Sequence, residues 1–90
     1  MRQEASYFDG KVPILIYIAK RLNDALRLES VFTEAGLDYG VEPDEYRGGI
    51  IFHSARTGAF FYVVPELVER AHEIMRTSGY KPYLGPQPEG

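Results

Sequence analysis

The sequence predicts one α+β domain in which two helices cover one face of an antiparallel sheet. Two observations support this prediction. Two amphipathic stretches of helical period are separated by short apolar runs rich in β-branched and aromatic residues. Their order is strand, helix, three strands, helix and a possible last strand, which fits the βαββαβ order of a ferredoxin-like sandwich.

The first strand is expected over 12–18, because this run is rich in β-branched residues and is short for a helix. Strict alternation places Leu15 and Tyr17 on one face, opposite Ile14 and Ile16. Since both faces are apolar, we expect a central strand whose second face needs a cover.

The first helix is expected to begin at Asn23 or Asp24, since either side chain can cap the first turn. It should end at Gly36, a good residue just after a helix. Its inward stripe consists of Ala25, Leu28, Val31, Phe32 and Ala35. Alternation of apolar and polar residues then predicts a half-buried strand over 37–42.

A hairpin follows, with strands at 50–54 and 59–64 and a turn at Arg56-Thr57-Gly58. The second helix should start at Pro65, where a missing amide proton is harmless, and stop at Gly79. Its inward stripe consists of Leu67, Val68, Ala71, Ile74, Met75 and Ser78. Residues 80–84 could add a short edge strand.

The two ends of the chain lack such periods. Residues 1–10 are expected to be a loose leader, and residues 85–90, rich in proline and glycine, a disordered tail. The predicted domain therefore spans residues 1–84.

Composition narrows the function classes. The chain has 90 residues, of which 44% are hydrophobic, and no cysteine, which excludes disulfides and thiolate metal sites. Its net charge of −3 disfavours nucleic-acid binding. The longest apolar run, residues 12–19, is too short to cross a membrane, and the N-terminus does not resemble a secretory signal, so we expect a cytoplasmic protein.

The predicted sheet leaves one face without helices. The residues expected on that open face are Leu15, Tyr17, Phe52, Phe60 and Tyr62. This is a large apolar surface for a monomer, so the sequence predicts a homodimer formed through the open face.

A second hypothesis is a site for a small anionic ligand, such as a metabolite or nucleotide, at Arg47-Gly48-Gly49 with Arg56. Glycines let a backbone approach a ligand, and arginine suits phosphate or carboxylate. The run matches no phosphate-loop or dinucleotide motif, and a simple hairpin connection is the alternative.

A third hypothesis is single-stranded RNA binding, because residues 56–62 place aromatic side chains on a strand, as RNA-recognition domains do. Burial of these aromatics in the core or in a dimer interface is the alternative.

The two histidines do not suggest catalysis. Glu69 and His72 have a spacing used in some metal sites but fall on the solvent face of their helix, and His53 lacks an identifiable partner. We therefore expect no catalytic centre, no cofactor and no metal.

The chain also resembles a known family. The segment 24–37, which ends in Ala-Gly-Leu, and Val64-Pro65-Glu66 followed by Ala71 resemble the small bacterial domain described as a putative prokaryotic signal-transducing protein. That family is ferredoxin-like and distantly similar to PII nitrogen regulators. The resemblance implies a regulatory or interaction role and supplies no catalytic residues.

Overall fold

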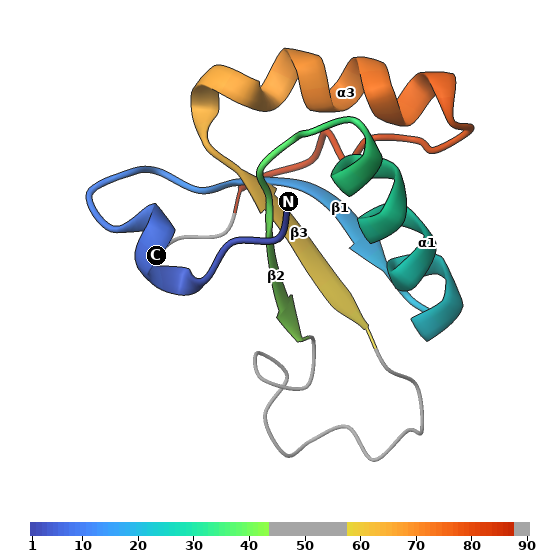
Figure 1. The fold of residues 1–90 in the computed structure, drawn as a ribbon, viewed down its shortest axis with the longest axis horizontal. Helices are drawn as coiled ribbons and strands as arrows, with labels where there is room; N and C mark the ends of the chain where they lie inside the picture. Colours follow the sequence, from blue (N-terminus) through green and yellow to red (C-terminus); the bar gives the residue numbers. More distant parts are fainter. Residues whose placement is uncertain (44–57, 88–90) are drawn as a thin grey trace.

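The computed structural model describes residues 1–43 and 58–87 (Figure 1). They form an α+β fold with a three-stranded antiparallel sheet and two α-helices. The elements are η1 (Ala5–Phe8), β1 (Ile14–Ala19), α1 (Leu22–Glu34), β2 (Gly40–Pro43), β3 (Ala59–Val63), η3 (Pro65–Leu67) and α3 (Val68–Thr77). The strand expected at 50–54 lies outside the described residues.

The sheet has the order β1-β3-β2, and β3 is antiparallel to both neighbours. The expectation of a central first strand is wrong, because β1 forms one edge of this sheet. Residues 80–84 form no regular strand beside it. Pro82 lies within this stretch and has no N–H to donate to a ladder.

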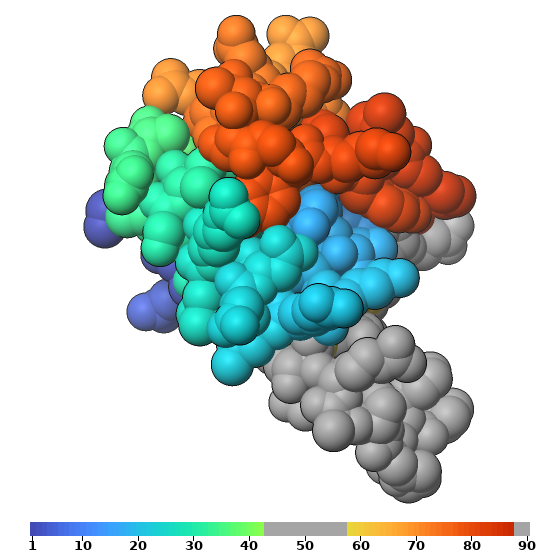
Figure 2. Space-filling model, turned by 90° about the vertical axis from the view of Figure 1, so that its right-hand side faces the viewer, coloured from blue at the N-terminus to red at the C-terminus, as the bar shows by residue number. Residues whose placement is uncertain are grey.

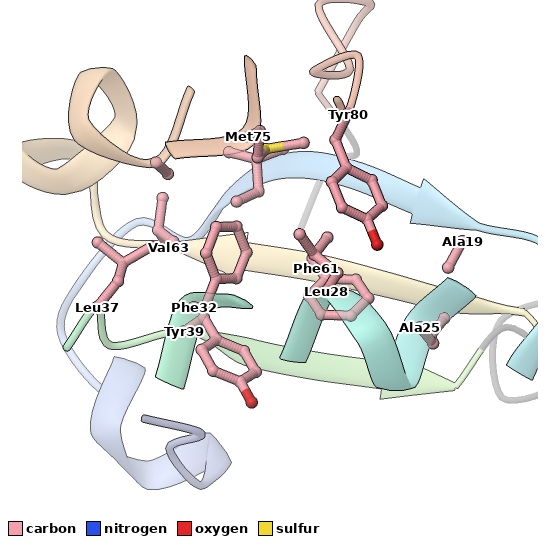
Figure 3. Packing of buried hydrophobic residues seen from close by; sticks show 13 residues of the cluster. Ala19, Ala25, Leu28, Phe32, Leu37, Tyr39, Phe61, Val63, Met75 and Tyr80 are labelled. Atoms are coloured by element: carbon pink, nitrogen blue, oxygen red, sulfur yellow. The ribbon is translucent and has the colours of Figure 1, made fainter. Parts of the chain in front are cut away.

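Both helices pack on the face of β3 that carries Ala59, Phe61 and Val63 (Figure 3). Phe61 is at the centre of this core, with its ring centroid 6.2 Å from that of Tyr17 and 6.3 Å from that of Phe32. The inward stripes of both helices are confirmed at Ala25, Leu28, Phe32, Ala71 and Met75, all buried. Each large side chain buried in this way contributes about 1.5–3 kcal/mol.

The first helix begins earlier than expected. Its N-cap is Arg21, whose side chain makes no capping bond, so the prediction of a cap at Asn23 or Asp24 is wrong. Asp24 lies inside the first turn, where a carboxylate interacts favourably with the helix dipole. The predicted end is confirmed, because Gly36 takes a φ of +73° directly after the helix.

A β-bulge changes the faces of β1. Leu15 is opposite Tyr62 and Tyr17 is opposite Phe61, so Ile16 is the extra residue with no partner on β3. Ile16 and Tyr17 therefore both face the helices, and Ile18 moves to the open face. The predicted position of Tyr17 on the open face is wrong, because strict alternation does not hold across a bulge.

The leader contacts the residues around the start of β2, and the expectation that it is loose stays a prediction. The Gln3 N–H donates to the Tyr39 carbonyl oxygen (2.7 Å), and the Tyr39 N–H donates to the Met1 carbonyl oxygen (3.1 Å). The ring of Phe8 then lies over Gly40, where a Cβ would be only 2.5 Å from the Phe8 Cε2 atom. The leader is thus held by hydrogen bonds to the main chain of Tyr39 and by packing of Phe8 against Gly40, where no side chain is in the way.

Residues 80–87 contact β1. Residues 80–87 lie along the outer edge of β1, and the Tyr83 N–H donates to the Ile16 carbonyl oxygen (2.7 Å). In Figure 2 these C-terminal residues, in red, lie against the blue residues of β1. The expectation of a disordered tail over 85–90 stays a prediction.

The contact between Phe8 and Gly40 predicts that the effect of Gly40→Ala on the free energy of unfolding depends on the residue at position 8. We expect Gly40→Ala to lower the free energy of unfolding by about 1–3 kcal/mol, because the new methyl group displaces the Phe8 ring. In a Phe8→Ala background the same change should be neutral or stabilising by up to about 1 kcal/mol, since glycine is unfavourable in a strand. Urea unfolding of the four proteins measures this cycle. Equal effects of Gly40→Ala in both backgrounds would contradict the contact.

Candidate functional site

The open face of the sheet holds three of the five residues predicted for an interface. The register pairs Leu15 with Tyr62 and Ile18 with Phe60, and all four lie opposite the helices. Leu15 is only 3% exposed, whereas Ile18, Phe60 and Tyr62 are half-buried. Phe52 lies outside the described residues.

The carboxyl group of Glu42 lies beside these aromatic rings. Glu42 is opposite Phe60 in the register of β2 and β3, and the Tyr62 hydroxyl donates to the Glu42 Oε1 atom at 3.2 Å. A carboxylate at this position repels phosphate groups. Glu42 therefore places a carboxylate next to the aromatic rings of the open face.

The leader adds aromatic surface at one end of this face. The rings of Tyr7 and Phe8 meet edge to face with centroids 5.0 Å apart, and both side chains are half-buried. Because Phe8 also lies over Gly40, the leader extends the apolar strip formed by Leu15, Ile18, Phe60 and Tyr62. We call these side chains, from residues 8, 15, 18, 60 and 62, of which Leu15 is buried, the open-face strip.

Tyr17 belongs to a polar junction between β1, α1 and the C-terminal segment. Its hydroxyl donates to the Asp24 Oδ2 atom at 2.6 Å. Its ring meets that of Tyr80 edge to face, with centroids 5.5 Å apart. The guanidinium carbon of Arg27 is 5.8 Å from the Tyr80 ring centroid, within the range of a cation–π contact.

The tyrosines of this junction keep their protons. Burial, followed by the hydrogen bond to Asp24, raises the pKa of Tyr17 well above 10. Burial also raises the pKa of Tyr80, although Arg27 opposes this. The Tyr80 hydroxyl has no hydrogen-bond partner among the described residues. At neutral pH both groups can therefore donate hydrogen bonds but cannot act as bases.

The helix α3 carries the histidine that the sequence pairs with Glu69. Glu69 is exposed and His72 is half-buried. Burial, followed by the charge of Arg76, lowers the pKa of His72. Within residues 1–43 and 58–87, no three His, Asp or Glu residues come close enough together to hold a metal ion.

The residues predicted to bind an anion, Arg47, Gly48, Gly49 and Arg56, lie outside the described residues, as does His53. The hypothesis of a small-molecule site at this loop stays a prediction.

Sequence reasoning missed Gln87 and Tyr83, which contact β1 directly. Their signal was weak, because a proline-rich tail has no period that links it to a strand. The pairing of Phe8 with Gly40 had a clearer signal, since a glycine within a strand often marks a close approach by another group.

Comparisons of the chain with protein-family models, with curated proteins and with solved structures find no match. In the described part of the chain, neither α-helix combines the length and the apolar character that crossing a bilayer requires.

The bond between Tyr17 and Asp24 should link β1 to α1 energetically. We expect Tyr17→Phe to lower the free energy of unfolding by about 1 kcal/mol at neutral pH. In a double-mutant cycle with Asp24→Ala, the second substitution should cost less once the first has been made. Additive effects in urea unfolding would show that the two side chains do not interact.

The raised pKa of Tyr17 also predicts how stability depends on pH. Above pH 10 the unfolded chain loses the phenolic proton while the folded chain keeps it, so stability falls as pH rises. Tyr17→Phe should make this fall less steep than in the wild type. Unfolding at neutral pH and at several pH values above 10 measures the two slopes, and equal slopes would count against burial of Tyr17.

Proposed function

We propose that this chain is a non-enzymatic regulatory or protein-interaction module that forms a homodimer through the open-face strip. The observation that carries the proposal is the register of β1 and β3. It places Leu15, Ile18, Phe60 and Tyr62 together on the face opposite the helices, and three of them keep accessible surface.

A second copy suits this surface for a geometric reason. A two-fold axis would set the same strip of each protomer against the other, so apolar rings meet apolar rings. A stable interface usually buries about 800 Å² on each partner, more than four side chains supply. Phe8 from the leader widens the strip toward that size.

The carboxylate of Glu42 supports a protein partner over single-stranded RNA. An RNA strand stacked on Phe60 and Tyr62 would bring phosphates close to this group. In a dimer the same group lies at the side of the strip, where it can accept a hydrogen bond from the facing protomer.

We also infer that the fold is an irregular form of the ferredoxin-like sandwich. In support, β1 and β2 flank β3, α1 connects β1 to β2, and residues 80–87 lie at the outer edge of β1, where a last strand would pair. The regulatory role is the one implied by the resemblance to the signal-transducing family. The lack of cysteine fits a cytoplasmic location.

Introduction of a charge at Phe60 tests the dimer. The wild type should sediment as a dimer, and Phe60→Glu as a monomer, because two carboxylates would be buried against an apolar strip. Leu26→Glu is the matched control, since Leu26 is 52% exposed on α1, away from the open face, and this variant should stay dimeric. Circular dichroism checks that both variants keep their helices. A wild type that sediments as a monomer at high micromolar concentration would refute the proposal.

A further inference from the structure

Among the described residues, one main-chain hydrogen bond and the side chain of Gln87 hold the outer edge of β1. The Tyr83 N–H donates to the Ile16 carbonyl oxygen. The Leu15 N–H donates to the Gln87 Oε1 atom (2.7 Å), and the Gln87 Nε2 atom donates to the Leu15 carbonyl oxygen (3.1 Å). One carboxamide thus satisfies both outward-facing polar groups of Leu15.

This pair of bonds copies the pairing of an antiparallel ladder. Two opposed residues in such a ladder exchange both N–H···O bonds, and a primary carboxamide has the same donor and acceptor as a main-chain peptide group. The edge is poorly suited to a full strand. Pro13 has no N–H on one side of Leu15, and the bulge at Ile16 interrupts the ladder on the other side. A side-chain amide therefore suits this edge better than a regular strand does.

The C-terminal segment is shaped to present Gln87. The Tyr83 hydroxyl donates to the Pro86 carbonyl oxygen at 2.7 Å and closes a short loop. Gly85 makes room for this loop, because a Cβ there would be 2.7 Å from the Tyr83 hydroxyl oxygen. The loop brings the residue after Pro86 to the edge of β1.

On the N-terminal side of this loop, the C-terminal segment is anchored at Tyr80. Tyr80 is 9% exposed, and its N–H donates to the Met75 carbonyl oxygen at 2.8 Å. Beyond it, Leu84 is 74% exposed and residues 85–87 are also exposed. Between them, Pro82 and Tyr83 are half-buried, so release of residues 81–87 would uncover mainly these two side chains and the surface that they cover.

We propose that the outer edge of β1 is a binding site for an extended peptide of another protein that presents a glutamine carboxamide directly after a proline. Residues 81–87 occupy this site as an intramolecular competitor. A segment tethered by a few residues acts at an effective concentration of millimolar order, so a peptide binds well only after the competitor is released. The site differs from the open-face strip and does not depend on dimer formation.

Hydrogen exchange at the Leu15 amide tests the competitor. In Gln87→Glu the carboxylate cannot donate to the Leu15 carbonyl oxygen, so the segment should detach and the Leu15 amide should exchange about tenfold faster. Leu84→Ala is the matched control, because Leu84 lies in the same segment and is largely exposed. It should leave the exchange rate unchanged. An unchanged rate in Gln87→Glu would overturn the proposal.

A synthetic peptide of residues 81–87, blocked at both ends, tests the site itself. Added to the Gln87→Glu protein, it should slow exchange at Leu15, and a peptide with glutamate in place of the glutamine should not. The wild type should need at least about ten times more peptide for the same protection. Failure of the glutamine peptide to protect Leu15, or equal protection by both peptides, would overturn the proposal. The same measurements in a Phe60→Glu background separate this result from the fate of the dimer.

Discussion

The bulge at Ile16 is the constraint on which most of the structure depends. One extra residue in β1 turns both Ile16 and Tyr17 toward the helices. Tyr17 can then bind Asp24 and pack against Tyr80, which connects the first strand to the first helix and to the C-terminal segment. The same bulge leaves the Ile16 carbonyl oxygen available to Tyr83. A regular strand would instead direct the Tyr17 hydroxyl to the open face.

Residues near both ends of the chain cover the two edges of the small three-stranded sheet. A domain of this size buries a modest share of its surface, so each additional segment that covers an edge matters. The leader pairs with Tyr39 beside β2 and places Phe8 over Gly40. The C-terminal segment covers β1 at the opposite edge of the sheet. Uncovered sheet edges invite regular strand pairing with other chains, and at the outer edge of β1 a proline, a bulge and a side-chain amide limit such a ladder.

The polar groups of the described residues serve mainly to hold elements together. The hydroxyl of Tyr39 is within 3.5 Å of oxygen atoms of Glu29 and Thr33, which fixes α1 against the segment before β2. Burial raises the pKa of Tyr17, Tyr39 and Tyr80 above that of an ordinary tyrosine, so these hydroxyls stay protonated further into alkaline pH. The two surfaces that we propose for recognition, the open-face strip and the outer edge of β1, differ in character, because one is apolar and the other is polar.

The amino-acid sequence alone determined the two helices, their buried stripes and the strands β1, β2 and β3, because these features depend on local spacing. It also determined where the helices end, at Gly36 and Gly79, because this depends on backbone preference. It also placed Leu15, Phe60 and Tyr62 on the open face. Only the tertiary structure decided the side of Tyr17, the start of α1 and the positions of both chain ends. These features depend on contacts between residues far apart in the sequence, such as Phe8 with Gly40 and Leu15 with Gln87. The spacing of apolar residues along the sequence cannot predict such contacts, because the two partners belong to different segments of the chain.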